Sequence, residues 1–181
     1  KTFGCQMNVH DSERVSGMFE LDGMQKAESE DSADILFVNT CTIRENADDK
    51  LYGTLGQLKK WKSQKNQRRL LVGGCAAQKD KNLVREKAPW VDVVIGTHNL
   101  TNVVNLLNQS EDWGPVTEII EKIENLPTDA PSIRESEFSA WLTIQIGCNN
   151  SCTFCIVPSV RGPEISRRPG DVINEAKQLV D

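Results

Sequence analysis

Short apolar runs alternate with amphipathic stretches over the first 107 residues of the chain. The run Ile35 to Val38 is short, continuous and rich in β-branched side chains, which is typical of a strand buried on both faces. Comparable runs predict further strands at Leu70 to Val72 and at Val91 to Ile95. Thr2-Phe3 is interpreted as the tail of another strand.

Apolar side chains at helical spacing follow each of these strands. The first predicted helix begins with Asp11 as its N-cap and stops at Gly23, and the second starts at about Arg44. The third covers roughly Lys81 to Lys87, and the fourth covers Leu100 to Leu107. Four βα repeats in succession predict the α/β class, with an open parallel sheet and flanking helices.

The chain changes character after residue 107, where it becomes acidic and contains several prolines. A short extended piece is predicted near Val116 to Ile120. Trp141 to Ile146 then alternates as a strand does, and Asp171 is predicted to cap a last helix. We therefore predict an α/β domain over residues 1–125, a linker over 126–139, and the first strand–loop–helix unit of an incomplete barrel domain over 140–181.

The overall composition of the 181 residues is ordinary, with 38% hydrophobic and 26% charged side chains. The net charge of −5 gives no global electrostatic argument for nucleic-acid binding. No apolar run approaches the roughly 20 residues that a membrane span needs. The chain starts at Lys1 without a methionine and stops inside a helical pattern, so we expect it to be a fragment of a longer protein.

Three cysteines, Cys148, Cys152 and Cys155, lie within eight residues in a C-x3-C-x2-C run. Thiolates are soft ligands that suit iron–sulfur clusters, zinc or copper(I). A structural zinc site would normally add a second cysteine pair or two histidines, but the only histidines, His10 and His98, lie far upstream. The spacing therefore favours a four-iron cluster held at three irons, and the alternative is buried or zinc-bound cysteines.

The other three cysteines, Cys5, Cys41 and Cys75, each follow a predicted strand, at separations of 36 and 34 residues. Because parallel strands end along one edge of a sheet, these thiols should converge there. Gly4 and Gly74 precede two of them and would let the backbone approach closely. We expect a second metal or cluster site, the alternative being three separate small core residues. Strand-end cysteines of this kind indicate a reduced, cytoplasmic protein rather than a disulfide scaffold.

Several polar residues are secondary candidates. The basic run around Trp61 is interpreted as a solvated face rather than an RNA contact, and the two histidines as hydrogen-bonding loop residues rather than ligands. Three arginines after the cysteine run could hold a carboxylate or phosphate, or be solvated, and three residues beside the strand-end cysteines could orient them. The three arginines are Arg161, Arg167 and Arg168. The three residues beside the strand-end cysteines are Asn8, Asn39 and Arg44.

The C-x3-C-x2-C run, with Phe154 before its third cysteine, resembles the signature of the radical S-adenosylmethionine (SAM) superfamily. Together with the strand-end cysteines, it resembles the methylthiotransferase family over nearly the whole chain. The stretches that carry this resemblance are Thr2 to Asn8 with Asp11-Ser12-Glu13, Asn39-Thr40-Cys41 with Arg44 to Ala47, Gly73 to Gln78, and Gly147 to Gly162. Gly4 to Asn8 and Arg44 to Asp48 look like the branch of the family that modifies tRNA.

The resemblance implies an enzyme that adds a methylthio group to carbon 2 of an isopentenylated adenosine next to the tRNA anticodon. It implies two 4Fe–4S clusters. The cluster on Cys148, Cys152 and Cys155 would bind SAM and reduce it to a 5′-deoxyadenosyl radical. The cluster on Cys5, Cys41 and Cys75 would carry the inserted sulfur, and a second SAM would supply the methyl group.

The implied partners are the tRNA anticodon stem-loop and an electron donor such as flavodoxin or ferredoxin, without a membrane. No catalytic side chain beyond the six cluster ligands is assigned. By the same resemblance, the missing remainder would leave the fragment inactive alone. Two other functions remain open: modification of a ribosomal protein by the other branch of the family, and a non-catalytic zinc or iron–sulfur binding module.

Overall fold

The computed structural model describes residues 1–42, 46–121, 133, 136 and 138–180. Its centre is a parallel sheet whose strands lie side by side in chain order. The strands are β1 (Ile35–Thr40), β2 (Arg69–Gly74), β3 (Val93–Ile95) and β4 (Val116–Glu118). Thr2 forms a parallel bridge to Asn39, so the N-terminal residues extend the sheet beside β1. The predicted open parallel sheet is therefore confirmed.

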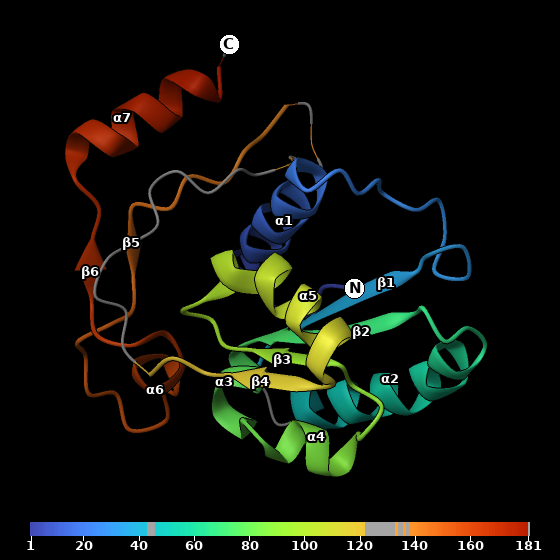
Figure 1. Cartoon of the computed structure of the whole chain (residues 1–181). Helices are drawn as coiled ribbons and strands as arrows, with labels where there is room; N and C mark the ends of the chain where they lie inside the picture. The colour runs from blue at the N-terminus through green and yellow to red at the C-terminus, as the bar shows by residue number, and fades with distance from the viewer. Residues whose placement is uncertain (43–45, 122–132, 134–135, 137, 181) are drawn as a thin grey trace.

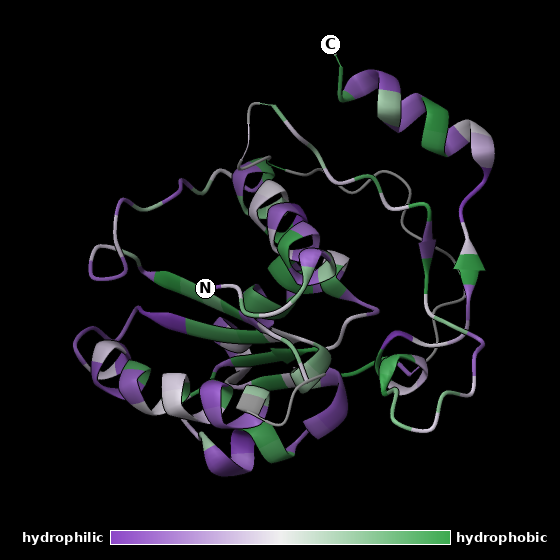
Figure 2. Cartoon of the chain, turned by 180° about the vertical axis from the view of Figure 1, so that it is seen from behind, coloured by the Kyte–Doolittle hydropathy of each residue, from purple (hydrophilic) through white to green (hydrophobic). Residues whose placement is uncertain are grey.

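Helices cover both faces of this sheet, with α1 and α5 on one face and α2 and α4 on the other (Figure 1). Their bounds are α1 (Gln6–Leu21), α2 (Asn46–Ser63), α3 (Cys75–Asp80), α4 (Leu83–Lys87) and α5 (Val103–Trp113), which the short 3-10 turn η1 (Leu100–Asn102) precedes. Figure 2 shows the apolar strands enclosed between helices whose outer faces are more polar. This layering matches the continuous apolar runs in the sequence, because a strand between two helical layers has no solvated face.

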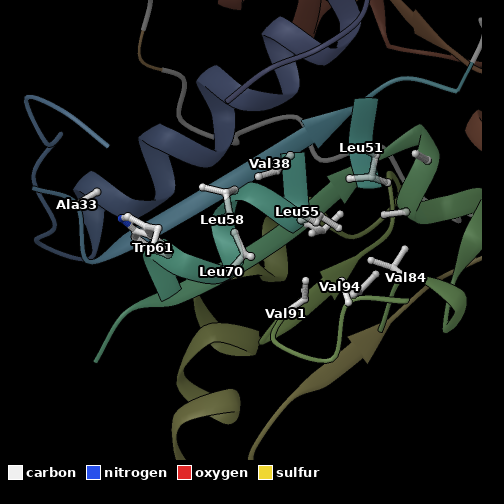
Figure 3. Close-up of a cluster of buried hydrophobic side chains, with 14 residues drawn as sticks. Ala33, Val38, Leu51, Leu55, Leu58, Trp61, Leu70, Val84, Val91 and Val94 are labelled. Atoms are coloured by element: carbon white, nitrogen blue, oxygen red, sulfur yellow. The ribbon is translucent and has the colours of Figure 1, made fainter. Parts of the chain in front are cut away.

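Two hydrophobic cores result, one on each face of the sheet. In the first, Leu51, Leu55 and Leu58 of α2 lie against Leu70 and other strand residues (Figure 3). Leu71, the next residue of β2, points into the second core with α1 and α5. Each of these leucine side chains is almost completely buried, which contributes about 1.5–3 kcal/mol per side chain relative to exposure.

Two helix boundaries differ from the sequence prediction. Asp11 is not an N-cap: the chain turns directly from the N-terminal strand into α1, and Cys5, with φ −94° and ψ 177°, is the N-cap residue. The helix expected over roughly Lys81 to Lys87 is present as α4 and starts at Leu83, because Lys81, with a φ of +52°, separates it from α3, a helix that the sequence pattern does not predict. The predicted start of α2 at Arg44 lies outside the described residues, and α2 begins at Asn46 as described.

The C-terminal part contains a short antiparallel pair of strands, β5 (Gln145–Ile146) and β6 (Ile165–Ser166), with α6 (Val157–Arg161) between them. The strand expected over Trp141 to Ile146 is assigned only at its last two residues, because only these pair with another strand. The final helix, α7 (Pro169–Gln178), starts at Pro169, so Asp171 lies in its first turn and is not its cap.

The predicted linker over residues 126–139 falls largely outside the described residues, and the three-part division of the chain stays a prediction. No helix in the described ranges is long and apolar enough to span a membrane.

Candidate functional site

The three strand-end cysteines lie at one edge of the sheet. Cys5 caps α1, Cys41 directly follows β1, and Cys75 is the first residue of α3 after β2. The register pairs Thr40 with Gly74, which places Cys41 and Cys75 immediately beyond a paired position. The structure therefore brings these residues, which are distant in sequence, to the same strand ends.

Two glycines allow the three segments to approach one another. A Cβ on Gly4, whose φ is +132°, would lie 2.7 Å from the Cβ of Cys41. A Cβ on Gly74, whose φ is +90°, would lie 2.2 Å from Oδ1 of Asn39. Any other residue would be strained at these φ values and would also push the segments apart. Glycine is thus required at both positions by the close approach of the cysteine segments.

A pair of buried amides holds the first turn of α1 against the end of β1. Nδ2 of Asn8 donates to Oδ1 of Asn39 at 2.9 Å and to the carbonyl oxygen of Thr40 at 3.2 Å. Nδ2 of Asn39 donates in return to the carbonyl oxygen of Asn8 at 2.8 Å and to Oγ of Ser12 at 3.0 Å. The Cys5 thiol donates to Oδ1 of Asn8 at 3.5 Å.

Asn8 and Asn39 are both completely buried, so their hydrogen bonds are shielded from water. They orient the segments that carry Cys5 and Cys41, as the sequence suggested. Arg44, the third residue proposed for this role, lies outside the described residues.

Cys75 is the most deeply buried of the six cysteines, with 3% of its surface exposed. Burial raises the pKa of its thiol, Arg161 opposes that shift by charge and hydrogen bonding, and Asp11 and Cys41 reinforce it. The thiol is therefore protonated in the free protein at neutral pH. A bound metal would have to displace that proton, which couples metal binding to proton release.

Arg161 connects the two parts of the chain at this edge. Its Nε donates to Sγ of Cys75 at 3.3 Å, and its Nη2 lies 2.7 Å from Oδ2 of Asp11. Arg161 is buried and holds a carboxylate, so of the two roles considered for the arginines, binding an anionic group applies to it and solvation does not. Although burial alone would lower the pKa of Arg161, Asp11 and Cys75 raise it, and the guanidinium remains charged.

The segment around Arg161 also contacts the second cysteine set. The backbone N–H of Cys148 donates to the carbonyl oxygen of Gly162 at 3.1 Å. Oγ1 of Thr97 donates to the carbonyl oxygen of Val160 at 2.6 Å, and α6 packs against α3. One short segment, residues 160–162, thus contacts both the strand-end cysteines and the start of the C-x3-C-x2-C run.

The second cysteine set lies on the surface between β5 and α6. Cys152 is exposed, whereas Cys148 and Cys155 are half-buried. The N–H of Cys155 donates to the carbonyl oxygen of Cys152 at 3.1 Å, which forms a turn between them, and the Phe154 side chain is exposed. This loop leaves its thiols accessible to an incoming ligand.

In neither set are the thiols assembled into a closed metal site. Within the described ranges, no group of three or more histidine, cysteine, aspartate or glutamate side chains could hold a metal ion. The donor chemistry of each set still fits a sulfur-ligated iron centre, because each provides three thiols. Their role as ligands remains a prediction.

The basic run around Trp61 is largely committed to structural contacts. Arg68 is buried over the Trp61 ring at 4.7 Å and donates to the carbonyl oxygen of Trp61 at 2.8 Å. Lys62 pairs with Asp92 at 2.7 Å. The predicted solvated face therefore applies to Lys59, Lys60 and Lys65, which are exposed, but not to Arg68, which is buried in contacts within the protein.

The remaining polar candidates differ in their burial and in whether they have a hydrogen-bond or ion-pair partner. Nδ1 of His98 donates to the carbonyl oxygen of Ile120 at 2.9 Å, as expected for a hydrogen-bonding loop residue. His10 is wrongly predicted as a loop residue: it lies inside α1, buried. Arg167 is buried and pairs with Glu175, whereas Arg168 is exposed.

Sequence reasoning did not anticipate the pairing of Arg161 with Asp11 and Cys75, nor the burial of His10. Asp11 precedes an apolar stripe, a local pattern that predicts a helix cap and gives no indication of an ion pair with Arg161. The position of an arginine shortly after the C-x3-C-x2-C run was the only sequence signal for this contact.

Residues 1–96 match the model of the family described as "Uncharacterized protein family UPF0004". The whole chain also aligns over 182 positions with curated proteins named tRNA-2-methylthio-N(6)-dimethylallyladenosine synthase. Identity is 52% with the protein from Corynebacterium efficiens, 54% with that from Leifsonia xyli and 53% with that from Mycolicibacterium gilvum. All of this chain is covered, but only 34–36% of each relative, so the chain spans about a third of their length.

Proposed function

The chain belongs to the uncharacterized protein family UPF0004, and from this premise we propose that it is part of a tRNA-modifying methylthiotransferase. The enzyme would add a methylthio group to carbon 2 of an isopentenylated adenosine next to the anticodon. The observation that carries the proposal is the identity of 52–54%, over the entire chain, to synthases named for this modified nucleoside. The two separate sets of three cysteines support it.

In this proposal each cysteine set holds one 4Fe–4S cluster. Cys148, Cys152 and Cys155 would hold the cluster that binds SAM, because their C-x3-C-x2-C spacing resembles the radical SAM signature. Cys5, Cys41 and Cys75 would hold the second cluster at the sheet edge. When bound, these cofactors and SAM supply the radical, sulfur and methyl-transfer chemistry that protein side chains lack.

The protein's own contribution is to position and shield these groups. The Asn8–Asn39 pair orients the segments that carry Cys5 and Cys41, and the burial of Cys75 keeps water from its sulfur. Arg161 places a fixed positive charge beside Cys75, which favours a negatively charged thiolate over the neutral thiol. A tRNA anticodon loop is a suitable substrate, because its unpaired bases can be displaced into a protein pocket.

Further parts of the proposal concern the protein's surroundings and organisation. A small electron-transfer protein such as flavodoxin or ferredoxin would be its reductant, and the cytoplasm its compartment. The α/β domain would comprise residues 1–125, followed by a linker over 126–139 and the beginning of a radical SAM barrel over 140–181.

Metal analysis of the anaerobically reconstituted chain tests the cofactor assignment. The six cysteines form two sets, so replacing either whole set with alanine should remove about half of the iron and sulfide. The two triple variants serve as controls for each other. Unchanged iron in either variant would contradict the assignment, and stoichiometric zinc without sulfide would favour the non-catalytic zinc module.

Product analysis in the longer enzyme, with isopentenylated anticodon stem-loop RNA, tests the reaction. Cys148→Ala, Cys152→Ala or Cys155→Ala should abolish reductive cleavage of SAM. The triple Cys5, Cys41 and Cys75 variant should still form 5′-deoxyadenosine but no methylthio nucleoside. Methylthiolated RNA from that triple variant would overturn the division of roles between the two sets.

A further inference from the structure

A small cavity lies beside α1, apart from the cysteines. It has a volume of about 40 Å³, which is room for a few water molecules or one small ligand group. One wall consists of Met7, His10, Asp11 and Arg14 of α1, and the opposite walls come from residues 97–101 and from Thr143, Ile146 and Arg161. None of the described residues that line it is a cysteine.

His10 is a buried polar side chain without a partner in this cavity wall. Only 4% of the residue is exposed, and neither ring nitrogen has a hydrogen-bond partner among the described residues. Burying an imidazole without any hydrogen bond is unfavourable, so nearly all such groups in folded proteins have a partner. The orphaned ring therefore points to a polar ligand in the cavity.

The charges around the cavity leave one cation in excess. Asp11 pairs with Arg161, and Glu175 pairs with Arg167. Arg14 is the third guanidinium nearby, and its Nε is buried without a hydrogen-bond partner in the described part of the chain. With a neutral histidine, three arginines and two carboxylates sum to a local charge of +1, which a single monoanion would balance.

His10 and Arg14 both have lowered pKa values. Burial lowers the pKa of His10, and Arg14 lowers it further, whereas Asp11 and Glu175 oppose the shift. Burial also lowers the pKa of Arg14, again against the effect of Glu175 and Asp11. Neutral His10 keeps one N–H donor, so the cavity presents an imidazole donor beside a guanidinium.

We propose that this cavity binds a phosphodiester group of the RNA substrate, with Arg14 and His10 as the donors. The inference rests on the proposed function. A phosphodiester carries one negative charge, and guanidinium groups bind phosphate oxygens through short, charge-assisted hydrogen bonds. Arg161 forms part of the cavity wall and also contacts Cys75. A phosphate held here would therefore fix the RNA backbone beside the cysteine edge, leaving base recognition to other contacts.

Nuclear magnetic resonance with dimethyl phosphate, a monoanionic phosphodiester, tests the site in the 181-residue chain without clusters or catalysis. The arginine Nε and histidine ring signals would be followed during titration, with acetate and an anticodon stem-loop RNA as parallel arms. We expect saturable shifts at Arg14 and His10 with dimethyl phosphate. Arg14→Gln should weaken this binding about tenfold or more, the equivalent of one lost hydrogen bond to a charged group. Arg168→Gln, which changes an exposed arginine outside the cavity, should leave it unchanged.

The outcomes separate this proposal from the proposed function. Unsaturable shifts, or binding that Arg14→Gln leaves intact, would overturn the site even if the longer enzyme makes the methylthio product. Acetate binding tighter than dimethyl phosphate, or RNA that leaves both signals unmoved, would overturn the assignment to an RNA phosphate. Shifts of the same two signals by dimethyl phosphate and by RNA would support it.

Discussion

Replacing Arg161 with methionine would remove the buried guanidinium between Asp11 and Cys75 while keeping most of the side-chain volume. Nη2 of Arg161 lies 2.7 Å from Asp11, and the two side chains are only 4% and 13% exposed. Removing one partner of a buried ion pair costs about 3–5 kcal/mol, because the other charge stays buried alone. Since Asp11 retains some contact with water, we expect the lower end, about 3 kcal/mol.

The assay is urea unfolding of the reduced, metal-free chain for Arg161→Met, Asp11→Asn and the double variant. If the pair is coupled as the structure indicates, the double variant should be about 2–3 kcal/mol more stable than the sum of the single effects predicts, because no unpaired charge remains. Arg168→Met is the matched control, since Arg168 is exposed, and should change stability by less than about 0.5 kcal/mol.

Hydrogen exchange of the Cys148 amide shows whether the loss is local. This amide donates to the carbonyl oxygen of Gly162, next to Arg161, so undocking of that segment would expose it. Arg161→Met should accelerate its exchange even if the sheet remains folded. Single-variant effects that add to within about 0.5 kcal/mol, together with unchanged exchange at Cys148, would refute the reasoning.

Three further predictions concern the stability of the metal-free chain. Gly74→Ala should destabilise it by about 2–4 kcal/mol, since the added Cβ would lie 2.2 Å from Oδ1 of Asn39 at a φ of +90°. Gly56→Ala, which has open space in α2, should stabilise by up to about 1 kcal/mol, and equal Tm values for the two variants would contradict this. Because the pKa of His10 is lowered by folding, its contribution to stability should be present above about pH 6.5 and lost as the pH falls below that value. Tm measured from pH 5 to 8 should show this decline, and His10→Leu should reduce it; an identical decline in the variant would count against the assignment. Burial and the 2.6 Å hydrogen bond to Asp80 raise the pKa of Tyr52, so stability should be lost as the pH rises above about 10. Tyr52→Phe should cost about 1 kcal/mol in urea unfolding at pH 7 and flatten the alkaline decline, and a fully retained decline would exclude Tyr52 as its source.

The sequence alone was sufficient for the α/β class and for the position of the strand-end cysteines. A short continuous apolar run such as Ile35 to Val38 must be buried on both faces of the sheet, and such a run can be recognised from the local sequence. Parallel strands end at one edge, so the order of elements already placed Cys5, Cys41 and Cys75 together. The start of α1 at Cys5 and the whole of α3, which ends before Lys81, were not predicted from the sequence, because they depend on single dihedral angles at these two residues.

Only the tertiary structure decided which polar residues have a hydrogen-bond or ion-pair partner and which have none among the described residues. Arg161 meets Cys75 across 86 residues of chain, and no local pattern distinguishes it from the exposed Arg168. His10 looked like a loop residue, yet it is buried in α1 without a hydrogen-bond partner among the described residues. Hydrophobic periodicity reports only which face of an element is buried, whereas the pairing of charges depends on packing between distant elements, and that information appears once the chain has folded.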